Sequence, residues 1–303
     1  AAATVSVATV SRALRGLPNV AASTRKRVER VASELNYRAD PAATRLATGR
    51  SRSLGVVVPF VNSWYCAEIM AGVEAVCAET GYDMVVISLR VDGDERRPID
   101  GTEALHRRVD GIVMVDVPLS GVELDAMIER GLAVVSIGPA LHGCASTGID
   151  DVAVGRIATD HLIELGHRRI GMIGDRADTV FGFVVPFHRQ QGYEEALVAA
   201  GIDVDPELLV EGSFTVQGGA EALEQLMKLD PPPTAVFAIG DIMAYGAIQR
   251  ARDLGLDVPG DVSIVGVDDQ PVSEVLGLTT VHQDVAEHGA RAARWLVDQL
   301  SDD

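Results

Sequence analysis

Short apolar runs alternate with helical stretches from Leu54 onward. The first group of runs comprises LGVVVPF, DMVVISL, DGIVMVD and LAVVSIG, and the second comprises IGMIGD, TAVFAIGD and VSIVGVDD. Their β-branched residues are typical of strands that are buried on both faces of a sheet. Because the runs alternate with helices, they predict parallel strands with right-handed crossovers, arranged as two α/β lobes. The cleft between two such lobes is the natural ligand site.

The connecting helices are predicted where apolar positions recur with helical spacing. They span about 65–80 and 120–130 in the first group, and about 187–200, 216–229 and 241–254 in the second. Each helix returns the chain to the start of the next parallel strand.

The N-terminal end of the chain is of a different kind and predicts two short helices. The first spans 6–14, with Ser6 as its cap and with Val7, Val10 and Leu14 at helical spacing. A turn follows at 16–19.

A second helix is expected to open at Ser23 or Thr24 and to run to about residue 36. Its buried stripe consists of Val28, Val31, Ala32 and Leu35, and its solvated positions are Arg25, Lys26, Arg27 and Arg30. Two such helices suit a helix-turn-helix unit, in which one helix enters the major groove and basic positions hold phosphates. A surface helical hairpin is the alternative, and periodicity alone favours neither.

The segment DPAATRLATG, from Asp40 to Gly49, predicts a short helix between these two regions. Asp40 can cap it, Pro41 suits its first position, and Gly49 can end it in a left-handed conformation. A helix of about two turns is marginal in water on its own. Leu46 must therefore pack against a second copy or enter another surface, and we interpret the segment as a conditional hinge helix.

Composition fits a cytoplasmic protein of two or three domains, with 303 residues, 47% hydrophobic and 23% charged. No uncharged apolar run is long enough to span a membrane, and the N-terminus lacks the features of a signal peptide. Cys66, Cys77 and Cys144 form no CxxC pair, which favours buried, reduced thiols.

The sign of the charge changes along the chain near residue 52, where the helical N-terminal region gives way to the alternating strands and helices. The net charge is −18, yet the first 52 residues carry 10 Lys and Arg against 3 Asp and Glu. All of the acidic excess therefore lies after residue 52. A small basic module joined to a large acidic one indicates that the first meets phosphate and that the second is repelled from it.

Four carboxylates stand at the carboxyl ends of predicted strands, where open α/β sheets bind ligands. They are Asp116, Asp175, Asp241 and Asp268. Such carboxylates accept hydrogen bonds from hydroxyl groups, but each could instead cap a helix or order a loop. Both interpretations stay open for Asp175 and Asp241. Ligand binding is favoured for Asp268, because Asp269 follows it and no helix starts at once.

Aromatic residues make up only 4% of the chain, so their placement is informative. Several lie after predicted strands or beside Arg189, namely Phe60, Trp64, Tyr65, Phe181, Phe187 and Phe214. Flat apolar faces beside polar groups suit a sugar or a nucleobase. Any single one could be core, so only the cluster counts as evidence.

Enzymatic motifs are missing from the sequence. It contains no GxGxxG after a strand, no GxxxxGK[ST], no HExxH and no metal-spaced Cys/His cluster. We therefore expect no catalysis, no cofactor and no metal. A solute-binding protein with the same two lobes is the alternative class, but it has no need of Arg12, Arg25 or the hinge.

Several motifs in order give the chain a family resemblance. VSVATVSRAL, TRKRVERVASELNY and DPAATRLATGRSRSLGVVVP resemble the DNA-binding head, hinge and first strand of the lactose-repressor/galactose-repressor family of bacterial transcription regulators. DHLIELGHRRIGMIG, RQQGYEEALVAAGI, PPPTAVFAIGDIMAYGAI, DVSIVGVDD and LTTVHQDVAEHGARAARWL agree with it further along. The resemblance covers nearly the whole chain.

The resemblance implies an α/β fold with a two-lobed periplasmic-binding-protein-like core, preceded by an all-α helix-turn-helix head and a hinge helix. The head would occupy 1–39, and the hinge helix and linker 40–52. The N-terminal lobe would comprise 53–151 with 278–303, and the C-terminal lobe 152–277. The family's first head helix is not present, Thr4 holds the position of its turn glycine, and no closing strand follows the last helix. Without that head helix, the chain is either a trimmed version of a longer protein, which we favour, or a protein whose DNA affinity is badly reduced.

For the head, the resemblance assigns base-edge reading to Val7, Ala8 and Arg12, and phosphate contacts to Ser6, Thr9, Asn19 and Thr24. Leu46 matches the family's minor-groove leucine, which kinks DNA as a wedge; packing against its dimer mate is the alternative. The implied partner is a near-palindromic operator, bound by a homodimer or by a tetramer built from it.

For the lobes, the resemblance implies a transcriptional regulator, in the first place a repressor, controlled by a sugar or a sugar derivative. Arg189 matches the effector-binding arginine, whose fork can hold two ligand oxygens; the alternative is a surface arginine near a helix start. The candidate effector site comprises Phe60, Trp64, Tyr65, Asp116, Phe187, Arg189, Phe214, Asp241 and Asp268.

Overall fold

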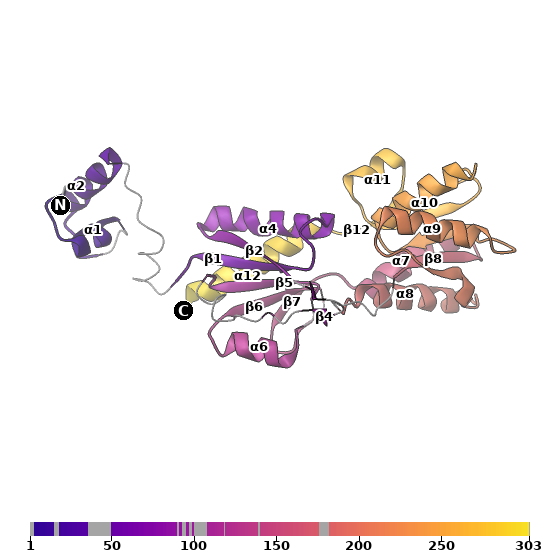
Figure 1. Ribbon diagram of the computed structural model, residues 1–303, viewed down its shortest axis with the longest axis horizontal. Coiled ribbons are helices and arrows are strands. Elements are labelled where there is room, and N and C mark those ends of the chain that lie inside the picture. Colours follow the sequence, from indigo (N-terminus) through magenta and orange to yellow (C-terminus); the bar gives the residue numbers. More distant parts are fainter. Residues whose placement is uncertain are drawn as a thin grey trace. The chain divides into compact units, whose positions relative to one another are not determined.

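The computed structural model describes residues 3–14, 18–35, 50–89, 91–92, 95–96, 99, 108–117, 119–138, 140–175 and 182–302. By its internal contacts the chain divides into two units, Ala1–Ser51 and Arg52–Asp303 (Figure 1). The hinge helix expected at 40–49, with Leu46, lies outside the described residues.

The N-terminal unit contains two helices, α1 (Val7–Leu14) and α2 (Ala22–Glu34). As predicted, the Ser6 hydroxyl caps α1, because its Oγ accepts a hydrogen bond from the backbone N–H of Thr9 at 3.1 Å. The expected start of α2 was wrong. That helix begins after Ala21, without a side-chain cap.

The apolar stripes of this unit are narrower than the spacing predicts. Its small core contains Ala3, Ala13 and Val28. Val7 is 85% exposed and Leu35 is 63% exposed, although both were expected to join the apolar faces. Two short helices enclose only a narrow core, so the outer ends of both stripes remain in solvent.

The first sheet of the larger unit has the order β2-β1-β5-β6-β7, and all its pairs are parallel. The strands are β1 (Ser53–Val58), β2 (Asp83–Ser88), β5 (Gly111–Val115), β6 (Ala133–Ile137) and β7 (Ala145–Thr147), and the short β3 (Val91–Asp92) and β4 (Glu95–Arg96) form a separate hairpin. Leu54, Val56 and Val58 pack beneath α4 (Trp64–Thr80) and α12 (Val285–Asp302), whereas Val57 faces the side of α6 (Gly121–Ile128). Helices thus cover both faces, as the predicted pattern requires.

The second sheet has the order β12-β11-β10-β8-β9 and is also parallel. Its strands are β8 (Ile170–Gly174), β9 (Leu209–Glu211), β10 (Ala235–Ala238), β11 (Ser263–Asp268) and β12 (Thr279–His282). Its helices are α7 (Asp151–Glu164), α8 (Val185–Ala199), α9 (Val216–Met227), α10 (Asp241–Asp253) and α11 (Pro271–Leu276), with the 3-10 turn η1 (Pro206–Leu208) before β9. Figure 1 shows α7 and α8 on one face of this sheet and α9 and α10 on the other.

The chain crosses between the two sheets after β7 and again after β12. The expected boundary at residue 278 therefore lies too early, because β12 pairs with β11 in the second sheet. Only from Val285 onward does the chain pack against the first sheet, through the contacts of α12 with α4, β5 and β6.

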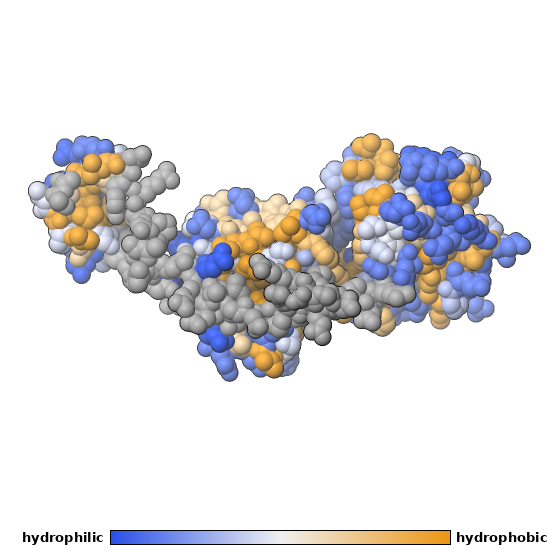
Figure 2. Space-filling view, viewed as in Figure 1, coloured by the Kyte–Doolittle hydropathy of each residue, from blue (hydrophilic) through white to orange (hydrophobic). Residues whose placement is uncertain are grey.

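The short helix α11 exposes an apolar surface on the second lobe. Val275 is 83% exposed and Val272 is 49% exposed, and Figure 2 shows hydrophobic surface over this helix. Neither residue belongs to the core clusters. Among the described residues, no helix is long and apolar enough to cross a membrane.

Close packing of α12 on α4 depends on glycines. A Cβ atom at Gly72 would lie 1.9 Å from the carbonyl oxygen of Ala286, and one at Gly289 would lie 2.1 Å from that of Ile69. Backbone atoms cannot yield as a flexible side chain can. The first lobe therefore requires glycine at both places to hold its last helix.

We predict that Gly72→Ala lowers the midpoint of thermal unfolding by about 2–12 °C, because overpacking costs about 1–3 kcal/mol. Differential scanning calorimetry measures it. Gly121→Ala is the matched control, since nothing lies within 4 Å of a Cβ at that helical position. Equal midpoints for the two variants would contradict the packing argument.

Candidate functional site

One exposed surface of the N-terminal unit carries the predicted base-reading residues. Val7, Ala8 and Arg12 are all exposed on α1, and residues four apart on a helix share a face, as Ala8 and Arg12 do. An apolar side chain left in solvent beside a guanidinium suits contact with base edges, including a thymine methyl group.

The predicted phosphate contacts lie at the ends of the two helices. The hydroxyl groups of Ser6 and Thr9 are 2.9 Å apart at the start of α1. Asn19 is exposed in the turn with a left-handed φ of 69°, and Thr24 is half-buried in the first turn of α2. Free N–H groups at helix starts suit phosphate, so both helices could contact a DNA backbone.

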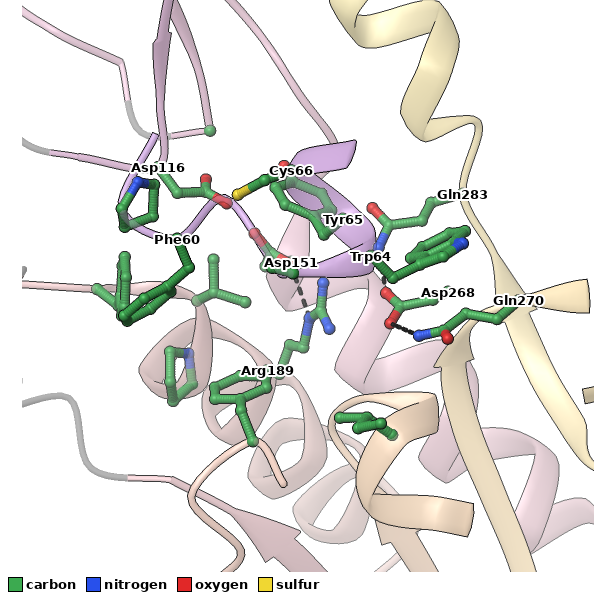
Figure 3. Close-up of a pocket in the computed structure, with 18 of the residues that line it drawn as sticks. Phe60, Trp64, Tyr65, Cys66, Asp116, Asp151, Arg189, Asp268, Gln270 and Gln283 are labelled. Atoms are coloured by element: carbon green, nitrogen blue, oxygen red, sulfur yellow. Dashed lines mark hydrogen bonds and ion pairs between the residues drawn. The ribbon is translucent and has the colours of Figure 1, made fainter. Parts of the chain in front are cut away.

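A cavity of about 610 Å³ lies at the carboxyl ends of strands from both sheets. It brings together seven of the predicted effector residues, namely Phe60, Trp64, Tyr65, Asp116, Arg189, Phe214 and Asp268. Figure 3 shows six of them around the cavity, with Arg189 pointing into it between Asp151 and Asp268.

Two predicted effector residues do not line the cavity. Phe187 is 57% exposed, and its ring lies 6.0 Å from that of His188. It precedes Arg189 by two residues on α8, so helical geometry turns it to a different side. Phe181 lies outside the described residues, and Asp175 is half-buried without being a lining residue.

Asp241 is the second correction, because its carboxylate serves the protein itself. Its Oδ2 accepts hydrogen bonds from the backbone N–H of Gln270 at 3.0 Å and from the Ser273 hydroxyl at 2.6 Å. Its Oδ1 accepts one from the Thr280 hydroxyl at 2.7 Å. The loop-ordering alternative is therefore correct. Asp241 holds the segment that carries Asp268 and Gln270.

Arg189 is buried and already engaged. Its Nε donates to Asp151 Oδ1 at 2.8 Å, and its Nη1 donates to the carbonyl oxygen of Ile239. Only 5% of the residue is exposed, so the surface-arginine alternative is wrong. The helices α7 and α8, which carry Asp151 and Arg189, pack closely at Gly155. A Cβ atom there would lie 2.1 Å from the Arg189 carbonyl oxygen, so only glycine allows this approach.

Asp116 presents an incompletely satisfied carboxyl group to the cavity. Its backbone is left-handed, with a φ of 51°, and its Oδ1 has no hydrogen-bond partner among the described residues. Loss of hydration raises the pKa of Asp116 to about 7, and the negative charge of Asp151 adds to this rise. The hydrogen bond from Tyr65 and the charge of Arg189 oppose it.

Asp268 stands at the end of β11 with a strained backbone. Its φ is 123°, a value that side-chain-bearing residues rarely adopt and that clusters at functional sites. The Gln270 and Gln283 side-chain amides donate to its two carboxylate oxygens (Figure 3). Burial raises the pKa of Asp268 to about 6, although Arg189 opposes the rise.

Several lining residues were not predicted. Asp151, Gln270, Gln283, His288 and Phe183 all line the cavity. Asp151 begins α7, where an acidic residue is ordinary, so the sequence offers no signal for it. Gln270 and Gln283 do carry a signal, because each follows a strand end by one or two residues.

The charges of the cavity favour an uncharged ligand. Three carboxyl groups, from Asp116, Asp151 and Asp268, face a single guanidinium among the described lining residues. That guanidinium is paired with Asp151, so none of the described lining residues offers an unpaired cation to a phosphate group. Carboxylates and amides beside aromatic faces bind hydroxyl groups. The described residues hold no cluster of three metal-ligating side chains.

Comparison with protein families gives two matches. Residues 1–40 match the bacterial regulatory proteins of the lacI family, and residues 159–303 match the periplasmic binding protein-like domain. The HTH-type transcriptional repressor CytR of Escherichia coli K12 is 35% identical over 306 residues, covering 98% of this chain and 87% of that protein. The regulator CelR of Thermobifida fusca is 35% identical over 304 residues, covering 97% and 88%.

Two solved structures share the fold of this chain over 99% of its length. The CelR–cellobiose complex has a TM-score of 0.70 at 32% identity, covering 99% of this chain and 91% of that one. The lac repressor dimer bound to operator and the anti-inducer ONPF has a TM-score of 0.84 at 27% identity, covering 99% and 90%.

We predict that Asp116→Asn makes the chain relatively more stable as pH rises. The ordinary pKa of 3.8 is raised to about 7 in the folded chain, so folding takes up a proton between these values. The wild type therefore loses stability relative to the variant through this window. Unfolding midpoints at pH 5 and pH 8 measure it.

Asp125→Asn, on the exposed side of α6, is the control and should leave the pH profile unchanged. If the wild type and Asp116→Asn kept a constant difference in midpoint between pH 5 and pH 8, the raised pKa of Asp116 would be refuted.

Proposed function

Because the chain belongs to the LacI family of bacterial regulatory proteins, it is a DNA-binding transcriptional regulator and not an enzyme, and we propose that an uncharged, hydroxyl-bearing effector in the cavity controls its affinity for operator DNA. The observation that carries the effector proposal is the surplus of carboxyl groups over cations, beside aromatic faces, among the lining residues that the structure describes. Such groups need hydrogen-bond donors, which a sugar or a sugar derivative supplies. The chain acts where the chromosome lies, in the cytoplasm.

The effector would change DNA affinity by shifting the chain between two conformations that differ in how far the lobes close. Strand ends of both sheets line the cavity, so an effector that contacts both lobes favours one degree of their closure. In a homodimer, two heads bind the two halves of a near-palindromic operator. Closure of the lobes would change the spacing of the two hinges and so the affinity for that operator. Leu46, which lies outside the described residues, would be the minor-groove wedge of the hinge.

Two observations support a sugar over other effectors. The related CelR was solved with cellobiose, and its fold matches 99% of this chain. The cavity also carries Trp64, Phe60 and Phe214, whose flat faces suit the apolar face of a sugar ring. A solute-binding protein without a DNA role is disfavoured, because residues 1–40 match the lacI family.

We predict that uncharged sugars, polyols or nucleosides raise the unfolding midpoint, whereas their phosphate esters do not. Thermal-shift measurements on a matched panel test this. Phe214→Ala should weaken binding of the active compound about tenfold by removing an aromatic face. Phe187→Ala is the matched control, a phenylalanine of the same lobe that does not line the cavity.

A phosphate ester that stabilises the chain more than its parent sugar would overturn the proposed charge preference. Equal losses of affinity in Phe214→Ala and Phe187→Ala would remove Phe214 from the effector site.

We predict that Arg12→Ala and Arg27→Ala impair DNA binding in different ways. Arg12 is exposed on the face of α1 that also carries Ala8, and loss of a bidentate contact to guanine costs about 1–3 kcal/mol at one base position. Arg27 is exposed on α2, so its loss should weaken binding equally at all sequences and reduce its salt dependence. Selection from randomised duplexes, followed by titrations at two salt concentrations, measures both effects. Unchanged sequence preference in Arg12→Ala would exclude base reading by Arg12.

A further inference from the structure

Two buried polar atoms of the cavity lack a hydrogen-bond partner among the described residues. They are Oδ1 of Asp116 and Nδ1 of His288. The Asp116 carboxyl group already belongs to the proposed effector site. The imidazole of His288 has no role in the fold or in the function described so far.

The position of His288 is fixed by its helix. It lies in the first turn of α12, its backbone N–H donates to the carbonyl oxygen of Asp284 at 3.3 Å, and only 8% of the residue is exposed. The neighbouring Gly289 packs against the backbone of Ile69 on α4, where even a Cβ atom would not fit. The helix cannot rotate there to carry the imidazole into solvent.

The imidazole is uncharged in this place. Burial lowers the pKa of His288, and the charge of Arg291 lowers it further, against the opposing effect of Asp284 and Glu287. A neutral imidazole offers one N–H donor and one acceptor nitrogen. It can therefore bond to a hydroxyl group in either direction.

An unpartnered buried nitrogen is unfavourable for folding. Leaving such a group without a partner costs about 1–3 kcal/mol, whereas an apolar residue of similar shape would cost nothing of the kind. A histidine that served only to pack α12 would be better replaced by leucine. A ligand group that enters the cavity and bonds to the nitrogen recovers this cost.

We propose that His288 is a specificity-determining residue of the effector site, where Nδ1 hydrogen-bonds a hydroxyl group of an uncharged ligand. This inference rests on the proposed function and deepens it. It assigns one ligand hydroxyl to the first lobe in addition to those that the carboxyl groups bind. Ligands that lack this hydroxyl are rejected because the buried nitrogen then stays unpaired.

The test compares His288→Leu with His288→Asn, using the uncharged panel compound that shifts the wild type most and its monodeoxy analogues. In the absence of ligand, His288→Leu should raise the unfolding midpoint by about 2–4 °C, since it removes an unpaired polar group. By isothermal titration it should bind the parent compound about tenfold more weakly.

The remaining measurements identify which ligand hydroxyl group bonds to Nδ1 of His288. One monodeoxy analogue should bind the wild type about tenfold more weakly than the parent, yet bind His288→Leu as well as the parent does. His288→Asn, whose amide reaches the place of Nδ1, should restore most of the affinity. His161→Leu, on an exposed position of α7, is the control and should behave as the wild type.

Each other outcome counts against the inference. Lower ligand-free stability in His288→Leu would make His288 a structural residue, and unchanged affinity in that variant would exclude a ligand contact, while the proposed function would stand in both cases. If no panel compound bound the wild type, the proposed function would fail and this inference with it.

Discussion

The buried ion pair between Arg189 and Asp151 sets the chemistry of the cavity. Its atoms lie 2.8 Å apart, and the two side chains are 6% and 12% exposed. Such a pair adds little net stability, yet losing one partner leaves a buried charge uncompensated. Burial raises the pKa of Asp116 to about 7 and that of Asp268 to about 6, and the nearby charge of Arg189 opposes both rises without cancelling them. A ligand that donates hydrogen bonds is therefore favoured over an anion.

Backbone strain at the strand ends directs the side chains around this pair. Asp116, Phe214 and Asp268 line the cavity with φ values of 51°, 46° and 123°. Residues other than glycine occupy this region at a cost of about 1–3 kcal/mol, which the surrounding packing must offset. The hydrogen bonds of Asp241 to the segment after Asp268 are one such support, although Asp241 does not line the cavity.

Most of the fold could be predicted because it depends on repeated local patterns. The buried strands and the five helices predicted in the lobes begin and end within a few residues of their expected limits, since periodicity accumulates over their length. No limits were predicted for α7 and α12. The strands β7, β9 and β12 are three or four residues long and carry too little pattern to predict. Missing β12 also placed the last crossing between the lobes too early.

The sequence by itself determined the basic head, the acidic two-lobed core and the strand ends that face a ligand, because charge, spacing and strand position are local properties. The tertiary structure decided which side chains meet there. Asp241 turns into the protein and Asp151 turns to Arg189, a distinction set by packing between helices that are remote in the chain. The unpaired nitrogen of His288 could not be foreseen either, because an unsatisfied atom is defined only by everything that surrounds it.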